Sequence, residues 1–419
     1  MSKRTKVLAA VMSTVVMTTA LMGCGGSSSS SSSSSSSTAA SNSSASGSSS
    51  SASIEGSTIT VWSHLSTDEV KELKTIAEKW ASDNKCTVKV VEDKGEMQDA
   101  INAMKSSKGP DIYFGLAHDN LGTYQKSGVL EEVPEGTFDK SDYTQGCVDA
   151  VTIGGKNYAI PLATECVALF YNADKVKEEP KTIEGVVDSG KFLFDAQNFY
   201  QAFGMLSAKG GYVFKNNNGT LDVNDIGLGN DGAVEGFKMI QKMVEKDGMN
   251  ADVNGDIAKA KFTGGETDYY ISGPWDIADC EKSVSNLGIV ALPTLGGEAM
   301  KPFMGVQCAF VNSNSKNKDA AWMLMKYLNE NCGDLLIEKG NRIPASKKAQ
   351  GSEKLKANKY ADTFIKAAEV AIPMPNILEM GSVWDPGANA LKAVVAGTDA
   401  KEAASKCVSD IKEKIAASK

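Results

Sequence analysis

The stretch from residue 59 to residue 80 reads ITVWSHLSTDEVKELKTIAEKW, and it decides the fold. Its first four residues are β-branched or aromatic, which predicts a strand over residues 59–62. Ser66 and Glu69 then have the spacing of a capping box, which marks the start of a helix. Apolar residues recur every three or four positions over residues 70–80, as on one face of a helix. A strand followed at once by an amphipathic helix is the repeating unit of an α/β protein.

The same alternation continues along the chain. Further strands are predicted at residues 87–91, 111–114, 268–271, 288–292 and 303–311. Further helices are predicted at residues 320–329, 363–371, 388–396 and 400–417. The sequence therefore predicts an α/β fold, in which ligands bind beyond the carboxyl ends of the strands.

Polar and aromatic residues follow three of these strands. His64, Asp119 and Trp275 each come shortly after a strand, and Trp384 is expected in a loop bounded by glycine and proline. A sugar site needs such a mixture, because hydroxyl groups need fixed donors and acceptors while the apolar faces of the ring lie on flat aromatic rings. The alternative for both tryptophans is a hydrophobic plug beneath a loop.

The N-terminus has the parts of a secretory signal. Three of the first six residues are basic, and residues 7–22 are mostly apolar but short for a membrane span. Gly23-Cys24 follows and resembles the bacterial lipobox. The resemblance implies a signal peptide over residues 1–23 and a lipid on the thiol of Cys24. An ordinary signal peptide with a chance cysteine is the alternative.

A serine-rich segment comes next. Residues 25–53 are almost entirely Ser, Ala and Gly, with an unbroken serine run from Ser27 to Ser37. Because such a segment buries no apolar surface, residues 24–53 are expected to form a disordered tether that spans about 30 Å. The protein is therefore expected outside the cytoplasm, attached to the cell membrane through its lipid anchor only.

The composition excludes some partners. The chain has a formal net charge of −8, with 42% hydrophobic and 23% charged residues. An acidic globular protein is a poor ligand for nucleic acid or for anionic lipid, and a neutral ligand is favoured.

The cysteines predict no disulfide framework. The seven cysteines after Cys24 cannot all pair, and none has CxxC spacing, so scattered free thiols are expected.

Several motifs, in order along the chain, resemble those of the maltose- and maltodextrin-binding proteins of ABC importers. They are Gly109-Pro110-Asp111-Ile112, Ala117-His118-Asp119, Tyr158-Ala159-Ile160-Pro161 with Glu165, Gly273-Pro274-Trp275, Lys301-Pro302-Phe303 and Pro373-Met374-Pro375-Asn376. The resemblance implies a two-lobe periplasmic-binding-protein-like fold, with a ligand cleft between lobes joined by several hinge crossings. It also implies a protein without catalytic residues, cofactor or metal.

The resemblance implies roles for individual residues. Trp275, Trp384 and Tyr200 would be stacking platforms, and Asp119 and Glu165 would accept hydrogen bonds from sugar hydroxyls. Further polar contacts are implied at His64, Asn120, Asn198 and Ser66. The chain departs from the family at Gly115-Leu116 and Gly255, where aromatic residues are expected. These departures leave chain-length preference open and admit a related α-glucan as ligand.

The resemblance also divides the chain. The first lobe is expected in residues 54–163 plus 308–342, and the second in residues 168–304 plus 345–419. Closure of the lobes around maltose or a maltodextrin would deliver the sugar to the permease subunits of an ABC importer, with the binding protein acting as a monomer.

Other functions remain as alternatives. The protein could bind another neutral oligosaccharide, or serve sensing or adhesion. A glycoside hydrolase would need two paired carboxylates, for which Asp119 and Glu165 are the available pair. The sequence has no HExxH, GxSxG or P-loop motif. A GxGxxG match at residues 227–232 follows a segment broken by acidic residues, so it is interpreted as a helix start.

Overall fold

A seven-stranded sheet organises one part of the computed structural model, which describes residues 54–217 and 220–418. The signal peptide, lipidated Cys24 and tether predicted within residues 1–53 lie outside the described residues. The strands are β1 (Thr58–Ser63), β2 (Thr87–Glu92), β3 (Ile112–Ala117), β6 (Ile160–Glu165), β15 (Phe303–Val311), β16 (Ile343–Pro344) and β17 (Ile372–Pro373). Their order is β16-β6-β15-β3-β1-β2, and β17 pairs with the start of β15.

Both faces of this sheet are covered by helices, and its central strands β3 and β15 are accordingly almost entirely apolar and buried. On one face, Leu73 of α1 (Thr67–Asp83) and Leu324 of α10 (Lys318–Asn331) belong to one buried cluster. On the other, Ile101 of α2 (Met97–Met104) and Tyr124 of α3 (Leu121–Lys126) belong to a second. The β1 and β3 strands run parallel, so their carboxyl ends meet at one edge of the sheet.

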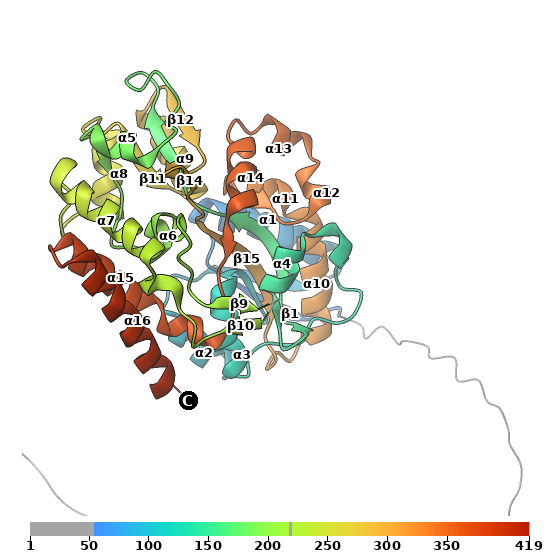
Figure 1. The fold of residues 1–419 in the computed structure, drawn as a ribbon. Coiled ribbons are helices and arrows are strands. Elements are labelled where there is room, and N and C mark those ends of the chain that lie inside the picture. The colour runs from blue at the N-terminus through green and yellow to red at the C-terminus, as the bar shows by residue number, and fades with distance from the viewer. Residues whose placement is uncertain (1–53, 218–219, 419) are drawn as a thin grey trace, which may run out of the picture. The chain divides into compact units, whose positions relative to one another are not determined.

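A smaller, four-stranded sheet carries the largest buried cluster. Its order is β12 (Leu287–Val290), β7 (Ala168–Asn172), β11 (Tyr269–Ser272) and β8 (Phe192–Leu193). Helices of this part include α6 (Phe199–Ser207), α7 (Asp231–Lys246), α15 (Trp384–Val395) and α16 (Ala400–Ala417). Figure 1 shows α15 and α16 beside α7, and residues of these helices pack together. Only residues 166–167 separate β6 from β7, so the chain passes there from one sheet to the other.

The remaining elements are short. They are α4 (Gln145–Ala150), α5 (Ile183–Asp188), α8 (Gly255–Thr263), α9 (Ile277–Ser283), α11 (Gly333–Glu338), α12 (Lys347–Gln350), α13 (Glu353–Ala357), α14 (Ala361–Val370), β4 (Thr152–Ile153), β5 (Lys156–Asn157), β9 (Lys215–Asn217), β10 (Thr220–Asp222), β13 (Thr294–Leu295), β14 (Glu298–Ala299), and the 3-10 helices η1 (His118–Asn120), η2 (Lys140–Asp142), η3 (Gly227–Gly229), η4 (Pro274–Asp276) and η5 (Leu378–Ser382). No helix among the described residues is long and apolar enough to cross a membrane.

Most predicted elements are confirmed, and one prediction is wrong. Ser66 and Glu69 form the predicted capping box, with both reciprocal hydrogen bonds. The GxGxxG match contains η3 and leads into α7, as the helix-start interpretation requires. Trp384, however, is the first residue of α15 and does not lie in a loop. Pro386 lies in the first turn of α15, where its missing N–H costs no hydrogen bond, so this proline does not break the helix.

The seven cysteines among the described residues are free thiols, as predicted, and all are buried except the half-buried Cys86.

Candidate ligand-binding site

The two predicted acidic ligand residues lie at the ends of two strands of the large sheet. Asp119 lies in η1, directly after β3, and Glu165 is the last residue of β6. β15 lies between these strands and pairs with both. Both side chains are largely but not completely buried. Two carboxyl groups are therefore held at the strand ends, the part of an α/β sheet where ligands bind.

Asp119 has an unusual protonation equilibrium. Burial raises the pKa of its carboxyl from 3.8 to about 7, and the charge of Glu165 adds to the rise. A hydrogen bond with the side chain of Trp384 acts in the opposite direction. Asp119 therefore changes charge near neutral pH, and one predicted platform already contacts one predicted acceptor.

Glu165 is held by three side chains. Its Oε1 accepts a hydrogen bond of 2.8 Å from Gln307 Nε2, and its Oε2 accepts one from Arg342 Nη1. The hydroxyl of Tyr200 donates to the backbone oxygen of Glu165 over 3.3 Å. Burial, followed by the charge of Glu165, raises the pKa of Tyr200 far above its usual range, so this hydroxyl stays a donor. The carboxylate direction is fixed before any ligand arrives.

The three predicted platforms are connected by ring contacts that run through Tyr200 and one further aromatic residue, Phe303. The rings of Trp275 and Tyr200 lie 6.3 Å apart, and Tyr200 stacks on Phe303 at 6.1 Å. Phe303 contacts Trp384 edge to face at 6.0 Å. Phe303 is fully buried, whereas Trp275 is 40% exposed. The platforms therefore rest on a buried support, and Trp275 is not a hydrophobic plug.

The turn that carries Trp275 is fixed by a buried carboxylate. Asp276 Oδ2 accepts hydrogen bonds from Ser272 Oγ at 2.6 Å and from Tyr270 Oη at 2.8 Å. Its Oδ1 accepts one from Lys259 Nζ at 3.0 Å. The indole lies flat on the backbone, since a Cβ at Gly273 would come within 2.2 Å of the Trp275 ring. A glycine is needed at this position for the indole to adopt its place.

The other predicted ligand residues have local structural partners. Ser66 caps α1, and Asn198 caps α6 by accepting from the backbone N–H groups of Tyr200 and Gln201. Asn120 Nδ2 donates to the backbone oxygen of Ala117 at 3.2 Å. The exposed His64 donates from Nδ1 to the backbone oxygen of Asp93 at 3.0 Å. These contacts place the residues near strand and helix ends, and their contact with a sugar stays a prediction.

His118 has a structural role that sequence reasoning did not assign. It is fully buried, its Nδ1 accepts from the backbone N–H of Val306, and its Nε2 donates to the backbone oxygen of Met374. Burial lowers the pKa of His118 to about 4, so the imidazole is neutral at physiological pH. The ring joins three distant segments directly beside Asp119.

Sequence reasoning missed Arg342, Glu69 and Gln307 as members of this site. Residue 342 was predicted only as the end of the first lobe, and Glu69 only as a capping residue. One signal was available, because Arg342 is the single arginine after Arg4 in a chain rich in lysine. A guanidinium is favoured over an ammonium where two carboxylates must be held in a buried place.

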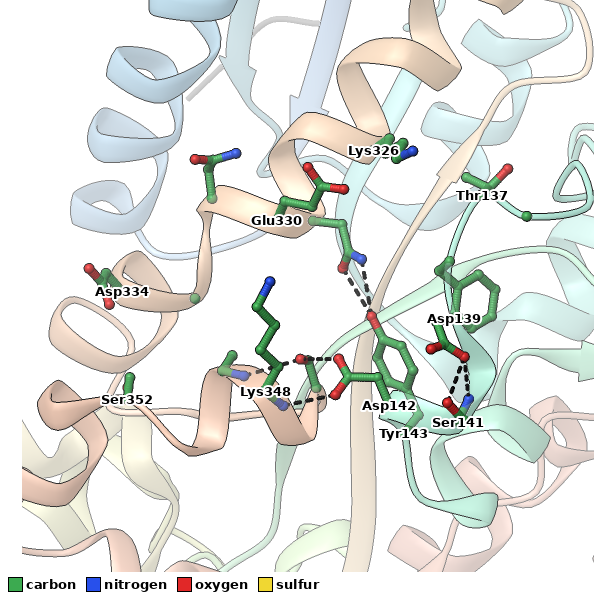
Figure 2. Close-up of a pocket in the computed structure, with 17 residues that line it drawn as sticks. Thr137, Asp139, Ser141, Asp142, Tyr143, Lys326, Glu330, Asp334, Lys348 and Ser352 are labelled. Atoms are coloured by element: carbon green, nitrogen blue, oxygen red, sulfur yellow. Dashed lines mark hydrogen bonds between the residues drawn. The ribbon is translucent and has the colours of Figure 1, made fainter.

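A polar hollow elsewhere does not belong to this site. Figure 2 shows a cavity of about 810 Å³ between the loop before α4, α10 and α12, and it contains none of the predicted ligand residues. Its polar groups are largely paired with one another: Asp142 accepts from Ser346 Oγ and from the backbone N–H of Lys348, and Tyr143 pairs with Asn329. These pairs brace the wall of the cavity.

Among residues 54–217 and 220–418, no group of three or more His, Cys, Asp or Glu side chains is arranged to hold a metal ion.

The fold and this site define a class of protein. The chain belongs to the bacterial extracellular solute-binding proteins, whose family model matches residues 75–363. It is similar in structure to the maltose-maltodextrin binding protein of Alicyclobacillus acidocaldarius, with a TM-score of 0.80 and 36% sequence identity, covering 85% of this chain and 100% of that one. The predicted two-lobe α/β fold and the predicted family are confirmed by these matches.

Curated relatives cover most of the chain. The maltooligosaccharide ABC transporter solute-binding lipoprotein of Streptococcus pneumoniae is 32% identical over 74% of this chain and 78% of its own length. The galactooligosaccharide-binding protein of Bacillus subtilis is 31% identical over 87% of this chain and 91% of its own length. The maltodextrin-binding protein MdxE of Bacillus subtilis is 31% identical over 82% of this chain and 88% of its own length.

Proposed function

We propose that this protein captures maltose or a maltodextrin-type oligosaccharide outside the cytoplasm and delivers it to an ABC importer. The observation that carries the proposal is a chain of ring contacts from Trp275 through Tyr200 and Phe303 to Trp384, beside the carboxyl groups of Asp119 and Glu165. Aromatic faces suit the apolar faces of glucose rings, and the carboxyl groups suit their hydroxyls. Maltose, maltodextrins or maltooligosaccharides are the named ligands of three of the four similar proteins described above, and these support the same class of sugar, whereas the fourth is named for galactooligosaccharides.

The protein acts by binding and not by catalysis. Asp119 and Glu165 are the carboxyl pair that a hydrolase would use. Glu165, however, is already held by Arg342 and Gln307, and Asp119 contacts Trp384, so both groups are arranged to receive hydroxyls. Release of glucose from maltotriose by the purified protein would contradict this assignment.

The two sheets support a two-lobe mechanism. In this proposal residues 54–163 plus 308–342 form the first lobe, and residues 168–304 plus 345–419 form the second. The carboxyl groups come from the first sheet and its hinge side, whereas Tyr200 and Trp275 come from the second. The lipid on Cys24 would keep the monomer at the cell surface near its permease.

Calorimetry against a panel of sugars tests the ligand. We expect maltose and longer maltodextrins to bind, and galacto-oligosaccharides, diacetylchitobiose and xylo-oligosaccharides to bind more weakly. Trp275→Ala and Trp384→Ala should each weaken binding by roughly 1–3 kcal/mol, because each removes a buried aromatic contact in the complex. Met323→Ala, at a residue 47% exposed on α10, is the control. Tighter binding of another sugar would show that the proposed ligand is wrong. Unaltered affinity in both tryptophan variants would show that the proposed binding site is wrong.

A further inference from the structure

Arg342 is the one arginine among the residues that the structure describes, and it is buried. The chain has 44 lysines and arginines together, of which Arg4 and Arg342 are the arginines. Every other basic position beyond the predicted signal peptide is lysine, including each surface ion pair. The exception is informative because lysine and arginine differ in geometry: a guanidinium presents five N–H donors in a planar fork, and an ammonium is a point charge.

The guanidinium fork joins two glutamates from distant segments. Nε donates to Glu69 Oε1 at 2.8 Å, and Nη2 lies 3.4 Å from Glu69 Oε2. Nη1 donates to Oε2 of Glu165. Burial opposes the charge of Arg342, but the charges of Glu165 and Glu69 outweigh it and raise the pKa of the guanidinium. Arg342 is therefore a permanent cation shared by two carboxylates.

The far side of the fork is rigidly anchored. Glu69 is fully buried in the first turn of α1, and its Oε2 accepts the backbone N–H of Ser66 at 2.9 Å in the capping box. Because the cap fixes Glu69 to the helix, Glu69 in turn fixes Arg342. The α1 N-terminus, which follows the first strand, is thereby connected to the end of β6.

The backbone between α11 and β16 positions Arg342 between Glu69 and Glu165. After α11, Asn341 adopts a left-handed conformation with φ of 50°, which asparagine tolerates better than most residues. The backbone N–H of Arg342 then returns to Leu336. A Cβ at Gly340 would come within 2.2 Å of Glu69 Oε1, so this turn closes over Glu69 only with glycine. Since Ile343 pairs with Thr164 in the antiparallel β16–β6 ladder, Arg342 comes opposite Glu165.

The arrangement leaves acceptor capacity for a ligand. Arg342 uses Oε2 of Glu165 and Gln307 uses Oε1. A carboxylate has about four lone-pair sites, so each oxygen keeps one site for a sugar hydroxyl. We propose that Arg342 is a positioning residue of the sugar site. Because Arg342 is held in place by Glu69, its hydrogen bond to Glu165 holds that carboxylate in the orientation that faces the ligand. The inference rests on the proposed function.

A double-mutant cycle tests this role. Maltotriose affinity is measured by calorimetry for the wild type, Arg342→Met, Glu165→Gln and the double variant. We expect Arg342→Met to weaken binding at least tenfold when Glu165 is present and less than twofold in the Glu165→Gln background. Arg342→Lys should lie in between, because it keeps the charge and loses the fork. Lys318→Met, which breaks the ion pair of Lys318 with Glu131, is the control and should leave affinity unchanged.

Each other outcome decides against the role. Equal losses with and without the Glu165→Gln change would show that Arg342 only braces the fold, and no loss would show that it is dispensable. If the Arg342 variants do not fold, as judged by circular dichroism, Glu69→Gln replaces them in the same cycle with the same expected dependence on Glu165. A wild type that binds no sugar of the panel would defeat the proposed function itself, which separates that failure from failure of the Arg342 inference.

Discussion

Asp119 is the predicted ligand residue whose charge responds most to its surroundings. Burial places the pKa of its carboxyl at about 7, so in the free protein this group gains its charge as pH rises through neutrality. Sugar hydroxyls donate to a carboxylate, and they stabilise its charged form. In the proposed complex, binding would therefore lower the pKa of Asp119, release a proton and be favoured as pH rises.

We expect sugar affinity to increase by up to about tenfold between pH 6 and pH 8, since the ionised fraction of a group with a pKa near 7 rises from about one tenth to about nine tenths. Calorimetry in buffers of different ionisation enthalpy measures both affinity and proton release. Asp119→Asn should bind more weakly and show a flat profile over this range. His118 is neutral above its pKa of about 4, so it does not contribute to the change in affinity between pH 6 and pH 8. A pH-dependent profile that persists in Asp119→Asn would assign the effect to another group.

The raised pKa of Asp119 gives the stability of the ligand-free protein the opposite pH dependence from sugar affinity. A carboxyl whose pKa is raised on folding stabilises the native state below its unfolded pKa of 3.8, and that contribution is lost as pH rises towards about 7. The ligand-free protein should therefore favour a more acidic pH than the sugar complex does. In the proposed site, function and stability are opposed at Asp119, which is common for residues at binding sites.

At the scale of elements, the turn after β11 presents Trp275 and depends on Asp276. The Asp276 carboxylate is almost fully buried and receives Ser272, Tyr270 and Lys259. We expect Asp276→Asn to destabilise the protein by about 1–3 kcal/mol, because an amide leaves at least one of these three donors without an acceptor. It should also weaken sugar binding, since the Trp275 platform loses its fixed position.

Urea unfolding and calorimetry on the same samples separate the two effects. Asp279→Asn is the matched control, because Asp279 lies 3.6 Å from the same Lys259 but is exposed, and it should change stability by less than about 0.5 kcal/mol. Asp276→Asn protein with full sugar affinity would show that the turn holds Trp275 without this carboxylate.

The elements also show which features could be predicted from sequence. Strands β1 and β15 and helices α1 and α16 are correct because periodicity and capping are local signals, readable within one segment. Trp384 was misplaced because proline was interpreted as a breaker, although it suits the first turn of a helix. The aromatic residues were found through family motifs. The Arg342 bridge was missed because Glu69 and Arg342 are 273 residues apart, and only the fold brings them together.

At the scale of the whole molecule, the proposed site is divided between two sheets. Asp119 follows β3 and Glu165 ends β6 in the seven-stranded sheet, and Trp275 follows a strand of the four-stranded sheet. A ligand shifts a conformational equilibrium only by its difference in affinity for the two states. A sugar that contacts both groups at once gains contacts when the lobes approach, so binding should favour the more closed form.

We therefore expect saturating maltotriose to reduce the radius of gyration measured by small-angle X-ray scattering. The double variant Trp275→Ala/Trp384→Ala should bind weakly through the carboxyl groups of one lobe only, and its radius should change less even at sugar concentrations that saturate it. Met323→Ala should behave as the wild type. Because closure needs contacts from both lobes, binding shown by calorimetry without any change in scattering would mean that the sugar rests on one lobe alone, and the closure mechanism would then be wrong for this protein.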